Sequence, residues 1–90
     1  MKKTVITVVG KDSVGIIAKV CTYLANNNIN ILDISQTIVQ GFFNMMMIAD
    51  TNESLKDFSV IKEELEQIGQ ELCCDIKMQR EDIFDKMHRI

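Results

Sequence analysis

The chain changes its hydrophobic period abruptly at the segment GKDSVGI, which runs from Gly10 to Ile16. Residues 3–10 before it are rich in β-branched side chains, as in an interior β-strand. After it, apolar residues recur three and four positions apart, which predicts an amphipathic helix from Val14 to Asn27. A strand that turns directly into a helix leaves unpaired amides at the corner, and such amides suit a small anion or zwitterion.

The rest of the chain alternates between strand and helix periodicity. Gln40 and Gly41 form an expected hairpin turn, and Asn26–Asn28 are expected to stop the first helix. Gly69 is expected to cap the second helix, and Ser54 and Asp57 have the spacing of a capping box before it. The predicted strands are 29–39, 42–50 and 71–79, and the predicted helices are 58–68 and 81–88.

The resulting order is β-α-β-β-α-β within residues 1–80, followed by a short C-terminal helical tail over 81–90. Short connections and right-handed crossovers select an α+β fold, a ferredoxin-like βαββαβ sandwich with a four-stranded antiparallel sheet and both main helices on one face. Because the strand 42–50 is apolar on both sides, the other sheet face should expose Phe and Met side chains. A second subunit or the tail must cover them, so we expect a single domain that forms a homodimer.

Composition excludes several classes of partner. The chain has 90 residues, 47% of them hydrophobic, and a net charge of -3 with scattered Lys and Arg. It therefore lacks the basic patch that binds nucleic acid or an anionic membrane. It also has no apolar run of membrane-spanning length and no signal-type N-terminus, so we expect a soluble, cytoplasmic protein.

The cysteines and the single histidine predict packing rather than chemistry. Cys73 and Cys74 are adjacent, which gives no metal or redox spacing, and they are expected on opposite sides of a strand. Cys21 is expected in the core of the first helix. His88 is the only histidine, so the sequence predicts no metal site.

Glycine spacing in the first loop is similar to that of a phosphate-binding Walker loop. However, Ile16 and Ile17 stand where that chemistry requires Lys and Ser or Thr, which argues against nucleotide hydrolysis. An acyl-phosphate hydrolase on the same fold would require an arginine near this loop, and both arginines are C-terminal. An RNA-binding sheet would require exposed aromatic residues in basic surroundings, which the acidic composition disfavours.

Residues typical of one known family are spread over the first third of the chain, in GKDSVGI and NNNINI. This combination resembles the ACT domain, a small regulatory module of amino-acid metabolism, and the resemblance covers nearly the whole chain. A stand-alone copy of this length, with the strand FFNMMM, resembles bacterial proteins that consist of a single ACT domain. It is also similar to the ACT portion of the glycine cleavage repressor. The residues that carry the resemblance are Asp12, Gly15, Ile16, Val20, Leu24, Asn30 and Ile31.

The resemblance implies a non-catalytic regulatory module that binds an amino acid or related metabolite at a homodimer interface, without cofactor or metal. Main-chain amides of the first loop would hold a carboxylate, while Asp12 and Asn30 would receive an ammonium or polar group. Val14 replaces the proline usual in the family. Asp12 stands where several serine-binding relatives have asparagine, so the ligand stays open, as does a purely structural dimerisation scaffold. The predicted site residues are Asp12, Ser13, Val14, Gly15, Ile16 and Asn30.

Overall fold

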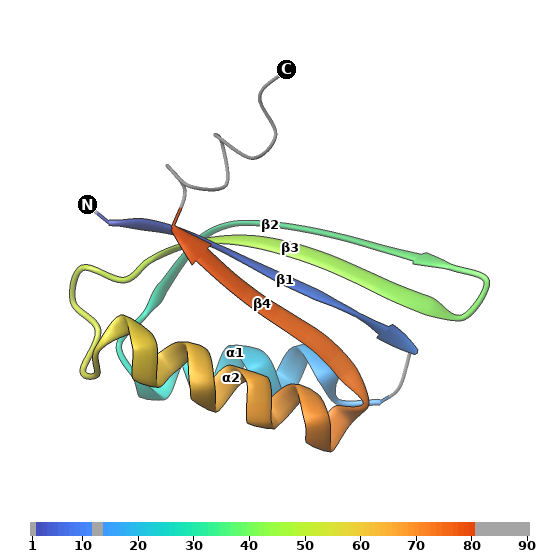
Figure 1. The fold of residues 1–90 in the computed structure, drawn as a ribbon. Coiled ribbons are helices and arrows are strands. Elements are labelled where there is room, and N and C mark those ends of the chain that lie inside the picture. Colours follow the sequence, from blue (N-terminus) through green and yellow to red (C-terminus); the bar gives the residue numbers. More distant parts are fainter. Residues whose placement is uncertain (1, 12–13, 81–90) are drawn as a thin grey trace.

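A computed structural model describes residues 2–11 and 14–80 and confirms the predicted element order. The strands pair antiparallel in the order β2-β3-β1-β4, and both helices cover one face of the sheet (Figure 1). This is the predicted α+β ferredoxin-like sandwich. The predicted tail helix lies outside the described residues, as do Asp12 and Ser13. The elements are β1 (Lys3–Lys11), α1 (Ile16–Asn26), β2 (Asn30–Val39), β3 (Phe42–Asp50), α2 (Phe58–Leu72) and β4 (Cys74–Arg80).

The core lies between the helices and the two central strands, β1 and β3. Side chains alternate along β3, so that Met45 and Met47 are buried while Phe42 and Met46 are exposed on the opposite face. The strand is therefore apolar on both sides, as predicted. The main core side chains opposite the sheet are Val20 and Leu24 of α1 and Ile61 and Leu65 of α2.

Helix α1 is shorter than predicted because its first residue is Ile16 rather than Val14. Gly15 is the N-cap and has a φ of 91°, a left-handed conformation that glycine adopts without strain. At the other end Asn28 has a φ of 59°, and the Ile29 amide donates to the Leu24 carbonyl at 2.9 Å. This Schellman-type closure confirms that asparagines stop the helix.

Helix α2 continues beyond Gly69, so the predicted C-terminal cap at this glycine is wrong. Gly69 is buried inside the helix, and a Cβ atom there would lie 2.7 Å from the Cys74 carbonyl oxygen. Its role is close approach of the helix to β4. The helix ends at Leu72, and Cys73, with a φ of 57°, takes the left-handed capping position. Cys73 is therefore not in a strand, and β4 begins at Cys74 instead of residue 71.

The start of α2 also differs from the prediction. Asp57 is its N-cap, without a side-chain capping hydrogen bond. Ser54 instead closes a local turn, in which its hydroxyl donates to the Lys56 carbonyl at 2.8 Å. The predicted capping box between Ser54 and Asp57 is therefore wrong.

The hairpin of β2 and β3 projects beyond the ends of the helices (Figure 1). Gln40 and Gly41 both have positive φ angles, 52° and 82°, as the predicted two-residue turn requires. Ile34 and Ile38 lie opposite Met47 and Phe43, which places them on the helix-covered face, yet they are 44% and 59% exposed. Neither helix within residues 2–11 and 14–80 is long and apolar enough to cross a membrane.

Candidate functional site

The corner between β1 and α1 leaves main-chain amides at the start of the helix. The Gly15 carbonyl accepts the first helical hydrogen bond, from the Lys19 amide at 2.9 Å, and no side chain among residues 2–11 and 14–80 caps the helix. The amides of the first helical turn, from Ile16 onward, have no partner within the helix. Because α1 begins two residues later than predicted, these donors lie C-terminal to Val14. A carboxylate in front of them would receive hydrogen bonds and the favourable end of the helix dipole.

The side chains around this corner differ in their surroundings. Val14 is fully exposed, whereas Ile16 is 2% exposed and packs in the core. Ile16 can therefore contribute only its main-chain amide to a ligand. The space around Gly15 is open, because a Cβ atom built there meets no atom within 4 Å. The glycine is required by its positive φ and not by crowding.

Asn30 lies at the opposite end of α1 from Gly15. It opens β2 and pairs with Asp50, which in turn pairs with Lys3 at the start of β1. Gly15 follows the far end of β1. Eleven helical residues separate the two positions along the axis of α1, a length of about 16 Å. One protomer therefore does not bring Asn30 and the Gly15 corner together around a ligand of amino-acid size.

The β2 edge of the sheet is a second notable feature. Within the described part of the chain this strand pairs with β3 alone, and nearly all of its residues are exposed. Strand alternation alone places Ile34 and Ile38 on one face of β2. It could not indicate that α1 and α2 leave the hairpin uncovered, because helix placement over a sheet is a tertiary property.

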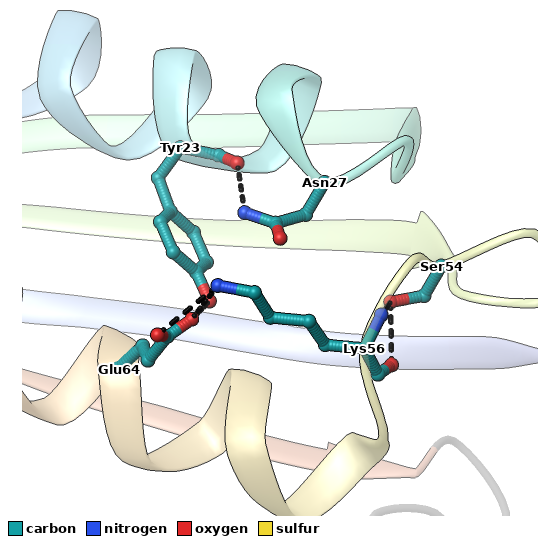
Figure 2. Close-up of polar contacts among 5 residues, drawn as sticks. All are labelled: Tyr23, Asn27, Ser54, Lys56 and Glu64. Atoms are coloured by element: carbon teal, nitrogen blue, oxygen red, sulfur yellow. Dashed lines mark hydrogen bonds and ion pairs between the residues drawn. The ribbon is translucent and has the colours of Figure 1, made fainter.

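A polar cluster that the sequence did not predict joins the two helices. The Tyr23 hydroxyl donates to Glu64, and the Lys56 ammonium donates to both carboxylate oxygens of Glu64, at 2.9 and 3.1 Å (Figure 2). The nearby Asn27 side chain donates to the Tyr23 carbonyl at 2.9 Å. These residues are far apart in sequence and follow no motif. The cluster fixes α1 against α2 and the loop before it.

Electrostatic coupling in this cluster shifts two ionisation equilibria. Hydrogen bonds from Lys56 and Tyr23 hold the pKa of Glu64 below its ordinary value of 4.5. Burial, together with the hydrogen bond and the negative charge of Glu64, raises the pKa of Tyr23 well above its usual range. Both shifts favour the neutral phenol beside a carboxylate, which is a structural pairing rather than an acid–base pair poised near neutral pH.

The Glu64 shift predicts a defined acid dependence of stability. Because the folded-state pKa is lowered, the ionised carboxylate stabilises the fold above about pH 4.5, and this contribution disappears as pH falls through the folded pKa. We expect Glu64→Gln to flatten the fall in unfolding free energy over this acid range, measured by urea denaturation. Lys56→Met should flatten it as well, since it removes the main cause of the shift. An unchanged acid slope in both variants would contradict this assignment.

Thiol chemistry receives little support from the structure. Burial, followed by the nearby Cys73, raises the pKa of the Cys74 thiol, which favours the unreactive protonated form. Cys21 is half-buried on α1, and Cys73 is exposed. Within the part of the chain that the structure describes, no three potential His, Cys, Asp or Glu ligands are grouped around one point.

Comparison with known proteins identifies the family to which this chain belongs. The sequence profile of the ACT domain family matches residues 2–79. A UPF0237 protein from Bifidobacterium longum is 58% identical over 90 residues, which cover all of both chains. The chain belongs to the ACT domain family, and its full-length relatives are the UPF0237 proteins.

Solved structures agree with this assignment. An ACT domain protein from Streptococcus pneumoniae superposes with a TM-score of 0.80 at 40% identity, covering 93% of this chain and 94% of that one. A glycine cleavage system transcriptional repressor superposes with a TM-score of 0.75 at 25% identity, covering 88% of this chain and 45% of that one. Both similarities predicted from the sequence are therefore confirmed. ACT domains are typically regulatory modules that bind small molecules and are usually non-catalytic.

Proposed function

We propose that this protein is a non-catalytic regulatory module that binds an amino acid or a related metabolite between two copies of the chain. The observation that carries the proposal is the separation of its two candidate ligand-binding regions. The Gly15 corner and Asn30 lie at opposite ends of α1, a helix about 16 Å long. A two-fold axis is the simplest means of placing the corner of one copy near Asn30 of the other.

The β2 edge supports a two-fold axis at this position. Its ten residues include one charged side chain, Asp33, whereas the shorter opposite edge, β4, carries Asp75, Lys77 and Arg80. Charged side chains protect an edge strand from pairing, so β4 is protected and β2 is available. Antiparallel pairing of two β2 strands would also cover Ile34 and Ile38, the apolar side chains that the helices leave exposed.

Antiparallel pairing also has the correct polarity for a shared site. In such a pair the start of β2 in one copy approaches the end of β2 in the other. The end of β2 lies in the same row as Phe42 and Lys11, at the end of the sheet where the Gly15 corner follows. Asn30 of one copy therefore moves toward the corner of the other.

The chemistry of the predicted site favours a zwitterion. Amides of the first turn of α1 would receive the ligand carboxylate, and Asp12 would neutralise its ammonium group. Asp12 would repel a simple carboxylate that lacks an ammonium. Ligand binding would then change the contacts between the two copies, and a partner protein would recognise that change.

Calorimetric titration with each of the twenty amino acids tests this proposal, with acetate as the control. We expect saturable binding of at least one amino acid, no binding of acetate, and a loss of about tenfold or more in affinity for Asp12→Ala, since a charge-assisted hydrogen bond disappears. Absence of binding by all twenty would contradict the ligand site. It would leave the alternative function, a dimerisation scaffold without a ligand.

A further inference from the structure

The connection between β3 and α2 lies against the joint between α1 and β2. We define this connection, residues 51–57, as the strap. The Leu55 amide donates to the Asn27 carbonyl at 3.1 Å. The Asn28 side-chain amide donates to the Glu53 carbonyl at 3.0 Å. Two hydrogen bonds therefore join the strap to the end of α1.

Asn30, the predicted ligand-binding residue of β2, follows this joint after a short connection. Asn28 has a left-handed backbone with a φ of 59°, and Ile29 between the two asparagines is 5% exposed. A connection this short and this well packed leaves little freedom between the joint and the start of β2. The position of the joint therefore sets the position of the Asn30 side chain, and a binding residue acts well only when its support is fixed.

Hydrogen bonds, rather than buried apolar side chains, hold the strap in place. The structure describes every residue of the strap, and none of them is buried. Its large apolar side chain, Leu55, is 70% exposed. Segments with few buried apolar contacts open more easily than the core of a domain. Loss of a polar contact should therefore release the strap without unfolding the rest of the chain.

Glu64 of α2 provides the contact that joins the strap to both helices. The Lys56 ammonium donates to both of its carboxylate oxygens, at 2.9 and 3.1 Å, and the Tyr23 hydroxyl of α1 donates to the same carboxylate (Figure 2). Asn27 connects the two sets of contacts, because its side chain donates to the Tyr23 carbonyl and its own carbonyl accepts the Leu55 amide. One carboxylate thus links the strap, α1 and α2.

The contact between Lys56 and Glu64 should be stronger than an isolated ion pair at the surface. Their side chains are 43% and 34% exposed, against 53% or more for the side chains of the other two ion pairs among the described residues. Lower exposure reduces screening by water, and charge-assisted hydrogen bonds are stronger than neutral ones. Removal of this carboxylate should therefore have a measurable effect on the strap.

We propose that Glu64 is a positioning residue for the ligand site, because it closes the strap against the joint between α1 and β2 and so fixes Asn30. This inference rests on the proposed function. Coupling between two parts of a protein is reciprocal, so a closed strap that favours ligand binding is itself favoured by bound ligand. Ligand binding is thereby transmitted from β2 to α2 within one chain.

Calorimetric titration of the full chain with the tightest-binding of the twenty amino acids tests the proposal. We expect Lys56→Met and Glu64→Leu each to lower the affinity about fivefold or more. Charge exchange, in which Lys56→Glu is combined with Glu64→Lys, should restore the affinity to within about twofold, because the ion pair forms again with reversed charges. Asp75→Asn, which removes an exposed ion pair on β4, is the matched control and should bind as the wild-type chain does.

Hydrogen exchange of the Leu55 amide distinguishes positioning from general stabilisation. Bound amino acid should slow this exchange in the wild-type chain. Lys56→Met and Glu64→Leu should speed it without changing the exchange of amides in β3, because the strap opens locally. The loss of affinity in each variant is then assigned to the strap and not to the stability of the core.

Unchanged affinity in variants whose Leu55 amide exchanges faster would overturn the inference and leave the proposed function intact. A charge-exchanged chain that binds as weakly as the single variants would also overturn it. The same conclusion would follow if bound amino acid left the Leu55 exchange unaltered. A wild-type chain that binds none of the twenty amino acids would instead contradict the proposed function, and this inference with it.

Discussion

Met47→Ala is expected to lower the free energy of unfolding by about 2–5 kcal/mol, the range for large-to-small changes in a tightly packed core. Met47 is 0% exposed on the central strand β3, and it packs between the sheet and the two helices. Its replacement removes buried apolar surface and leaves a cavity that neighbouring side chains fill only in part. Urea denaturation at a fixed, low protein concentration measures the loss.

Met46→Ala provides a control for the same residue type at the next position in the chain. Met46 is 42% exposed on the opposite face, so its replacement should change the unfolding free energy by less than about 1 kcal/mol. Similar large losses for both variants would contradict the assignment of the two faces of β3. Similar small losses would show that the core does not depend on Met47.

The order of elements could be predicted because hydrophobic period changes clearly along this chain. Two patterns are typical of a β-strand: the β-branched run before Gly10 and the alternation of Met45, Met46 and Met47. The asparagines after α1 and the Gln40–Gly41 turn also carry local conformational preferences. Such signals depend on a residue and its immediate neighbours, so sequence analysis finds them.

The features that sequence analysis missed depend on tertiary contacts. A glycine near the end of a helical pattern resembles a cap, but Gly69 is needed where α2 touches β4, and Cys73 takes the left-handed position. The Tyr23–Glu64 contact joins side chains 41 residues apart and leaves no periodic trace. The exposure of Ile38 follows from how far the helices extend over the sheet.

The sequence indicated the separate regions of the candidate site but not their positions relative to each other. The corner at Gly15 follows from a strand-to-helix joint, and Asn30 was carried over from the ACT resemblance. Their positions at opposite ends of α1 follow from the topology of β1, α1 and β2, in which the helix returns along the full length of the sheet. Because of this separation, a ligand site that combines the two regions requires two copies of the chain.

The second large effect is expected on ligand binding, when two variants that each bind poorly are mixed and share one dimer. Asp12→Ala and Asn30→Ala should each abolish most binding of the amino acid that the wild-type chain binds, because each site loses one polar contact. In a dimer with shared sites, each site combines Asp12 of one copy with Asn30 of the other. A mixed dimer of the two variants then contains one intact site and one site that carries both substitutions.

Titration of an equimolar mixture, after the subunits have exchanged, tests the central claim most directly. Random pairing makes about half of the dimers mixed, so the account predicts recovery of about one quarter of the wild-type sites at wild-type affinity. Each variant measured alone at the same total concentration is the control. A mixture that binds no better than the two variants alone would contradict a ligand site shared between two copies of this chain.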